Sequence, residues 1–135
     1  MNITSLEALR ALYDPVRERS ALKELPQLDV HATRFIGLSP LVVLSSAGAN
    51  GALDASPRGG EPGFVKVLDP QTLLIPDAPG NNRLDTLENI VQTGQIGLLF
   101  LVPGMDETLR VNGSALLTTD EADRERSADA RRVPK

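Results

Sequence analysis

The stretch LVVLSSAGANGALDAS, residues 41–56, decides the fold. Its first six residues are apolar or small and include adjacent valines, which is typical of a β-strand. The following AGANG contains Asn-Gly, the strongest short-range signal for a tight hairpin turn. ALDAS then returns as a second strand, which we expect Pro57 to interrupt. The stretch therefore predicts an antiparallel β-hairpin.

Helix signals come before this hairpin. Residues 4–7, Thr-Ser-Leu-Glu, have the form of a capping box, and leucines then recur at helical spacing as far as Tyr13. A second helix is expected over residues 14–26, which begin with Asp-Pro. A third is expected over residues 30–38, with Asp29 as its cap, because Ser-Pro follows and stops it.

Strand signals dominate the chain after the hairpin. RGGEPG, residues 58–63, has the composition of a flexible loop. FVKVLD (64–69) and TLLIP (72–76) are each the length of a strand, and Asp-Pro turns the first into the second. One helix is then expected from about Leu84 to Gln92.

Two more strands follow that helix. IGLLFLV, residues 96–102, has the continuous apolar composition of a buried strand. TLRVNGSALLT, residues 108–118, predicts a long strand with a bulge at Asn112-Gly113. The order of elements predicts an α+β protein: an antiparallel barrel of about six strands, with N-terminal helices and one inserted helix.

The length of 135 residues and the mass of 14.5 kDa suit a single domain, residues 1–135. We divide it into a helical N-terminal part (1–40), the barrel (41–119) and a polar tail (120–135). Acids and bases are equally frequent in the tail, and Val133 is its only large apolar residue. Such a composition is typical either of a solvated helix or of a disordered end.

Composition argues against several classes of protein. The net charge of −4 and the pI near 4.9 disfavour a nucleic-acid-binding protein, which needs clustered Lys and Arg. The chain has no cysteine and one histidine, so we expect no disulfide and no metal site. It shows no signal-peptide pattern, and no apolar run approaches the roughly 18 residues of a membrane span. We therefore expect a cytoplasmic protein.

The sequence contains no persuasive acid–base machinery. There is no G-x-S-x-G motif, and Ser45 and Ser46 have no histidine near them in the sequence. His31 is best interpreted as a surface or helix-packing residue. The acidic pair Asp106 and Glu107 lies in a turn and is typical of solvated charge.

Two arginines lie in contexts that suit an anion. Arg58 is followed by two glycines, which allow a ligand to approach the backbone. Arg83 lies in PGNNRLD, where Asn81 or Asn82 can cap the helix and leave free N–H groups pointing outward. Free N–H groups, the positive end of a helix and a guanidinium together form a phosphate site. The alternative is two ordinary turns with solvated arginines. Lys66, on the next strand, faces either the same pocket or water.

Several ordered motifs carry a family resemblance. SPRG, IPD…GNNR.D, GLLFLVPG and ETLRVNG follow one another within residues 41–115. This run resembles the FMN-binding split barrel of the pyridoxamine 5′-phosphate oxidase-like superfamily. The resemblance implies a homodimer with FMN in a groove at the subunit interface, and a small-molecule redox substrate.

The resemblance also implies roles for individual residues. Ser56 and Arg58 would hold the phosphate or ribityl part of FMN, and Asn82 and Arg83 would hold the phosphate at the start of the inserted helix. Backbone groups of Ile75-Pro76 would line the isoalloxazine or ribityl group. Thr108 would come from the partner subunit, at a place where relatives carry a longer polar side chain.

The sequence also departs from the family pattern. DASPRGG stands where pyridoxamine phosphate oxidases proper carry a basic strand motif, and the C-terminal substrate residues of those enzymes have no counterpart within the 135 residues. The barrel is therefore expected to be incomplete. Three functions stay open: an FMN-dependent oxidoreductase, a non-enzymatic flavin or haem binding or sensor module, and a cofactor-free barrel dimer.

Overall fold

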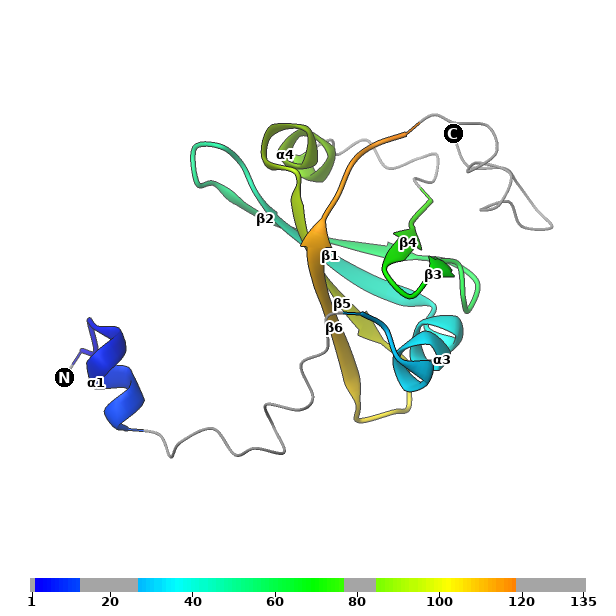
Figure 1. The fold of residues 1–135 in the computed structure, drawn as a ribbon, viewed down its shortest axis with the longest axis horizontal. Coiled ribbons are helices and arrows are strands. Elements are labelled where there is room, and N and C mark those ends of the chain that lie inside the picture. Colours follow the sequence, from blue (N-terminus) through cyan, green and yellow to red (C-terminus); the bar gives the residue numbers. More distant parts are fainter. Residues whose placement is uncertain (1, 13–26, 77–84, 119–135) are drawn as a thin grey trace.

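The computed structural model describes residues 2–12, 27–76 and 85–118 (Figure 1). These residues form three helices and six strands. In chain order the elements are α1 (Leu6–Ala11), α3 (Val30–Leu38), β1 (Leu41–Ala47), β2 (Leu53–Gly59), β3 (Lys66–Asp69), β4 (Thr72–Leu74), α4 (Asp85–Thr93), β5 (Gln95–Leu101) and β6 (Thr108–Ser114). The helix expected over residues 14–26 and the tail from residue 120 lie outside the described residues.

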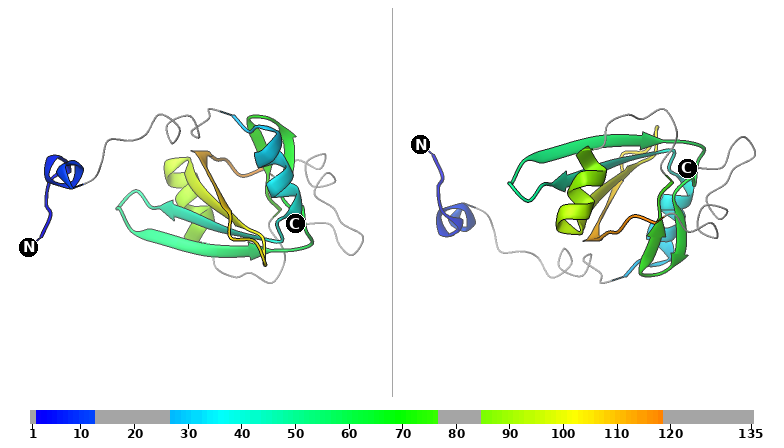
Figure 2. Two further views of the ribbon diagram at one scale, coloured as in Figure 1. Left: turned by 90° about the horizontal axis from the view of Figure 1, so that it is seen from below. Right: turned by 90° about the horizontal axis from the view of Figure 1, so that it is seen from above.

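The strands form one antiparallel sheet of four strands, in the order β2-β1-β5-β6, and a separate pair, β3-β4. The helix α4 is inserted between β4 and β5, and α3 precedes the first strand. The expected α+β fold with six antiparallel strands and an inserted helix is therefore confirmed. The two sheets do not close into a continuous barrel, so the architecture is a split barrel (Figures 1 and 2).

The helix caps follow the sequence closely. Asp29 caps α3, and its carboxylate accepts a 2.7 Å hydrogen bond from the backbone N–H of Ala32, as expected. In the first helix the cap is Ser5 rather than the first residue of the capping box: its hydroxyl accepts from the N–H of Ala8 at 3.1 Å. The inserted helix runs one residue beyond the expected Gln92.

The prediction that Pro57 interrupts the second strand was wrong, because β2 continues through it to Gly59. Pro57 lies opposite Val43, and β2 is an edge strand of the four-stranded sheet. Backbone nitrogens along β2 point alternately toward and away from β1. The N–H of Gly60 points toward β1, because it bonds to the carbonyl of Pro40 at 3.1 Å. The nitrogen of Pro57, three residues earlier, therefore points away from β1. Proline loses no ladder bond there. The expected loop over residues 58–63 is correspondingly shorter.

The bulge expected at Asn112-Gly113 was also wrong. The register of β6 against β5 is continuous, with Asn112 opposite Gly97 and Gly113 opposite Ile96. The strand ends at Ser114 rather than running to residue 118. Asn-Gly is a turn signal when the chain is free to bend, but here regular pairing along all of β5 overrides it.

The core lies on one face of the four-stranded sheet, which we call the inner face. Val42 pairs with Phe100 and Leu44 pairs with Leu98, and all four side chains are buried. Helix α3 and the β3-β4 pair cover this face, and Phe35, Ile36 and Val65 join the same cluster. Helix α4 packs on the same face, nearer to the β1-β2 hairpin.

The opposite side of the sheet is the outer face, formed by the alternate residues. It is largely apolar across β2, β1 and β5, and it includes Pro57, Val43 and Leu99 in one row and Leu41 and Leu101 in the next. On the edge strand β6 the face ends in the exposed polar residues Thr108, Arg110 and Asn112. Helices α3 and α4 both pack on the inner face, so neither covers this surface.

Candidate functional site

The first turn of α4 is fixed to the edge strand β2 by side-chain hydrogen bonds. The hydroxyl of Thr86 donates to the carboxylate of Asp54 at 2.6 Å, and the Thr86 side chain is 2% exposed. One turn later, the amide of Asn89 donates to the hydroxyl of Ser46 at 3.0 Å. Because Ser46 and Asp54 are paired across the β1-β2 hairpin, the helix is attached to both strands. The position of its N-terminal end is therefore determined by the sheet.

Arg58 and Ser56, the pair expected to hold an anion, lie together on the inner face of β2. The guanidinium Nη1 donates to the hydroxyl of Ser56 at 2.6 Å and to the carbonyl of Pro57 at 3.2 Å. Arg58 is only 8% exposed, because it lies opposite Val42 beside the core. Both of these hydrogen-bond partners are neutral. A buried cation is costly unless an opposite charge accompanies it, so this guanidinium is suited to receive an anion.

Asp54, Ser56 and Arg58 alternate along β2 and form a polar strip, which we call the β2 strip. Successive members are roughly 6.5–7 Å apart, as expected for alternate residues of a strand. At one end, the carboxylate of Asp54 accepts the hydrogen bond from Thr86, and its negative charge is favourable beside the N-terminal end of α4. Ser56 and Arg58 at the other end supply a hydroxyl and a cation. The strip can thus hold an anion at its Arg58 end, whereas the start of α4 lies beside its Asp54 end.

The other predicted residues are placed differently. Ile75 and Pro76 follow β4 and are half-buried, and Ile75 packs against the core cluster. Thr108 begins β6 on the outer face and is exposed. It lies on the opposite edge strand and the opposite face from Arg58, so one chain does not bring the two together. Asn82 and Arg83 lie outside the described residues.

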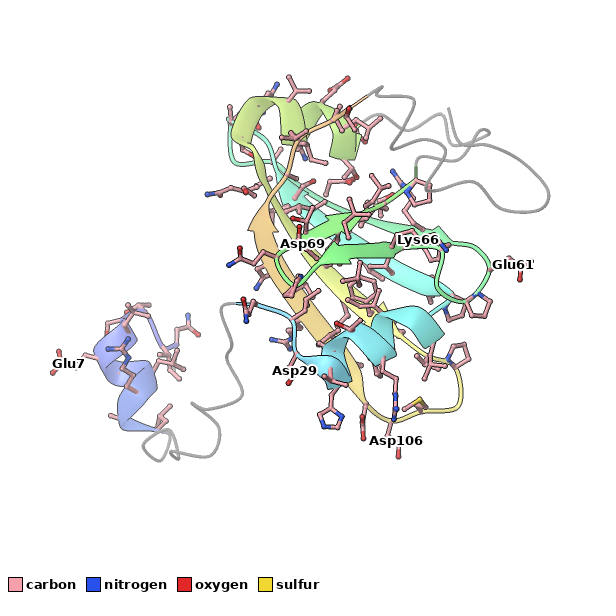
Figure 3. The ribbon with its side chains drawn as sticks, turned by 45° about the vertical axis from the view of Figure 1, so that its right-hand side comes forward. Glu7, Asp29, Glu61, Lys66, Asp69 and Asp106 are labelled. Atoms are coloured by element: carbon pink, nitrogen blue, oxygen red, sulfur yellow. The ribbon has the colours of Figure 1, made fainter. Side chains whose placement is uncertain are left out.

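Lys66 lies on β3 (Figure 3) between Val65 and Val67, both of which pack in the core, so by strand alternation its side chain points away from those two. His31 is exposed in the first turn of α3. Among the described residues, no group of three or more His, Cys, Asp or Glu could hold a metal ion.

Sequence reasoning missed the Thr86–Asp54 and Asn89–Ser46 pairs. A usable signal was present, since Asp54 follows the same alternation as Ser56 and Arg58 and so must share their face. Nothing local in the sequence indicates which helix residues meet them, because that depends on how α4 crosses the hairpin.

No helix among the described residues has both the length and the apolar character needed to span a bilayer.

Comparison with solved structures finds the same fold. The chain is similar to the crystal structure of Group A Streptococcus HupZ, with a TM-score of 0.63 and 19% identity, covering 79% of this chain and 82% of that one. A histidine-to-alanine variant of the same protein gives a TM-score of 0.62 at 19% identity, covering 78% and 86%. A search of curated proteins found no match.

The sequence itself identifies the family. The model of the family described as pyridoxamine 5′-phosphate oxidase matches residues 28–133. The match includes the hairpin, the β2 strip, the inserted helix and the last two strands. It therefore agrees with the resemblance carried by the SPRG, GLLFLVPG and ETLRVNG motifs. The chain belongs to the pyridoxamine 5′-phosphate oxidase family.

Proposed function

We propose that this protein binds FMN and is an FMN-dependent oxidoreductase acting on a small molecule. The observation that carries the proposal is the buried guanidinium of Arg58, whose hydrogen-bond partners Ser56 and Pro57 are neutral. A phosphate monoester would supply a negative charge, which neither of these two partners carries. Guanidinium groups bind phosphate through paired, charge-assisted hydrogen bonds, which are stronger than neutral ones.

The residues of the β2 strip fit this cofactor. The hydroxyl of Ser56 can donate to a phosphate oxygen, and Arg58 can balance its charge in a region from which the core excludes water. Asp54 would repel a phosphate at its own end of the strip, so the anion is directed toward Arg58. When bound, FMN supplies the hydride chemistry, whereas the protein's contribution is to bind and orient it.

Further residues of the proposed site come from the family resemblance. Asn82 and Arg83 would hold the phosphate together with the start of α4, where a helix N-terminus favours an anion. Ile75 and Pro76 would line the ribityl or ring system. Thr108 would complete the site from the partner subunit. This last assignment accords with its exposed place on the outer face, away from the β2 strip of its own chain.

The proposal includes a homodimer formed through the outer face. That face presents half-buried apolar side chains across three neighbouring strands, with Val43 and Leu99 near its centre. Burying such a surface contributes roughly 25 cal/mol for each Å² removed from water, so a second copy is a favourable cover. The absence of cysteine accords with the cytoplasmic location that we also propose.

The deciding experiment is FMN titration of the purified protein, followed by desalting and a visible spectrum. We expect retained flavin at about one per subunit, and protection against thermal unfolding. Ligand at a hundred times its Kd stabilises by about 2.7 kcal/mol. Arg58→Met should abolish retention, because it removes the cation while an unbranched, apolar side chain still occupies the position. The matched control is Arg34→Met, on the exposed side of α3, which should retain FMN as the parent does.

The outcomes separate the alternatives. No flavin binding by the parent protein would overturn the proposal and favour a cofactor-free barrel. A Soret band after incubation with haem, without flavin binding, would favour a haem carrier. Flavin binding without turnover on any reduced nicotinamide or small-molecule substrate would leave a non-enzymatic flavin module. Equal FMN affinity in the Arg58→Met protein and the parent would remove the phosphate site from the β2 strip.

A further inference from the structure

Asp54 has a second carboxylate oxygen that binds no described residue. Its Oδ2 accepts the 2.6 Å hydrogen bond from the hydroxyl of Thr86. Its Oδ1 accepts no hydrogen bond from the residues that the structure describes. Asp54 is half-buried rather than buried, so a ligand can reach its side chain. Because a carboxylate has acceptor positions on both oxygens and no donor, Oδ1 is suited to a hydrogen-bond donor from outside the chain.

The cation of the β2 strip lies closer to Asp54 than the sequence position of Arg58 suggests. The guanidinium turns back along the strand, because its Nη1 donates to the hydroxyl of Ser56 at 2.6 Å. It therefore lies beside Ser56, which is the neighbour of Asp54 in the strip. Alternate residues of a strand are roughly 6.5–7 Å apart. An anion held by Ser56 and Arg58 is thus about that far from the carboxylate of Asp54.

This spacing defines the kind of ligand that can bind both ends of the strip. The ligand needs an anion at one end and a hydrogen-bond donor roughly 6.5–7 Å away. An extended chain advances roughly 1.1–1.2 Å for each bond, so about five or six bonds span that distance. A short polyol phosphate has these properties, because hydroxyls follow its phosphate along a flexible carbon chain.

The charges around Asp54 favour a neutral donor over a cationic one. The N-terminal end of α4 lies beside the carboxylate, and its partial positive charge already stabilises the negative charge of Asp54. The guanidinium of Arg58 lies on the other side, next to Ser56. A ligand ammonium between the two would be repelled by both, whereas a hydroxyl would not. The donor that fits this position is therefore a hydroxyl.

We propose that Asp54 is a specificity-determining residue of the cofactor site. Its Oδ1 accepts a hydrogen bond from a hydroxyl of the ribityl chain, while Ser56 and Arg58 hold the phosphate. The inference rests on the proposed function, because FMN supplies both the phosphate and the hydroxyls. It adds that the β2 strip selects a flavin by the hydroxyls of its chain as well as by its phosphate. A hydrogen bond to a charged acceptor is stronger than a neutral one, so the selection is measurable.

The test compares FMN with its deoxy analogue, in which hydrogens replace the hydroxyls of the ribityl chain while the ring and the phosphate are kept. Titration followed by flavin fluorescence gives the Kd of each ligand. The Kd of the analogue divided by the Kd of FMN, which we call the hydroxyl ratio, measures the contribution of the chain hydroxyls. For the parent protein we expect a hydroxyl ratio of at least about ten, the size of one hydrogen bond to a charged acceptor.

The deciding variant combines Asp54→Ala with Thr86→Val. The Thr86 side chain is 2% exposed, so the second substitution avoids leaving a buried hydroxyl without its acceptor. The matched control is Thr86→Val alone, which loses the same hydrogen bond but keeps the carboxylate. We expect the hydroxyl ratio to fall at least about tenfold in the double variant and to stay within about twofold of the parent in the control.

A second variant, Asp54→Asn, keeps the shape of the side chain and an oxygen that can accept from Thr86. It removes the charge of the acceptor, so we expect the hydroxyl ratio to fall at least about threefold. Circular dichroism establishes that each compared protein is folded.

The outcomes distinguish this inference from the proposed function. A parent protein that binds neither FMN nor the analogue would overturn both. FMN binding with the same hydroxyl ratio in the parent and in both Asp54 variants would overturn the role of Asp54 and leave the proposed function standing. An equal fall in the double variant and in the Thr86→Val control would show that Asp54 acts only by fixing α4, and would also overturn it. So would tighter binding of an analogue that carries an amino group in place of a chain hydroxyl, because Asp54 would then recognise a cation.

Discussion

The hydroxyl of Thr86 donates a 2.6 Å hydrogen bond to the carboxylate of Asp54, joining the first turn of α4 to the edge strand β2. Thr86→Val keeps the shape of the side chain and removes this bond. We expect the free energy of unfolding to fall by about 1.5–3 kcal/mol, because the acceptor is charged. Urea unfolding followed by circular dichroism measures the loss. Thr33→Val, on the exposed side of α3, should change stability by less than about 0.5 kcal/mol.

Gly63 cannot be replaced without strain and a steric clash. Its φ is +81°, and an added Cβ would lie 2.9 Å from the backbone oxygen of Gly37. The comparison is Gly104→Ala, where φ is +88° and an added Cβ meets nothing within 4 Å. Each substitution should cost about 1–2 kcal/mol from the left-handed backbone, and Gly63→Ala should cost more because backbone atoms must also move. Equal unfolding midpoints for the two variants would contradict the close approach of Gly63 to α3.

Ser39 links the end of α3 to two strands. Its side chain is 1% exposed, and its hydroxyl lies 2.6 Å from the carbonyl of Leu101 and 2.7 Å from that of Leu41. Ser39→Ala leaves these part-buried carbonyls without the hydroxyl donor, so we expect a loss of about 1–3 kcal/mol in denaturant unfolding. Ser114→Ala, at the exposed end of β6, serves as the control and should be nearly neutral. A neutral Ser39→Ala would show that the hydroxyl is dispensable.

The proposed homodimer predicts a specific weakness at the centre of the outer face. Leu99→Glu places a charge between Val43 and Arg110, where a face-to-face contact would bury it. We expect sedimentation to show a monomer that keeps the circular dichroism spectrum of the parent protein. Leu38→Glu on α3 introduces the same charge outside the outer face and should leave the dimer intact. A Leu99→Glu protein that stays dimeric would exclude this face as the interface.

Local signals predicted the elements well where the signal and the packing agree. Asp29 at the start of α3 and Asn-Gly between β1 and β2 were both identified correctly, because caps and tight turns depend on a few neighbouring residues. The predictions of a break at Pro57 and a bulge at Asn112 were wrong because both residue types can lie inside a strand. Proline fits where its nitrogen points away from the neighbouring strand, and Asn-Gly fits where the pairing is regular on both sides. The local sequence does not determine whether a strand lies at the edge of a sheet, or which strand pairs with it.

The candidate site was predictable to a similar degree. Ser56 and Arg58 are two residues apart in a strand, so their common face follows from the sequence. The burial of Arg58 depends on its neighbour Val42 across the hairpin and on the layers above it, which no local pattern reveals. The outer-face position of Thr108 likewise depends on the register of β6 against β5. The roles of these residues toward FMN stay predictions.

Pro57 has a consequence for how copies of this protein meet. Its ring stands where β2 would otherwise present an N–H group to solvent, at the open edge of the four-stranded sheet. A strand from another molecule that adds to this edge loses a backbone hydrogen bond there, and the ring obstructs its approach. The β2 edge of the sheet is therefore guarded against growth by strand addition, the route by which unprotected edges lead to aggregates and fibrils.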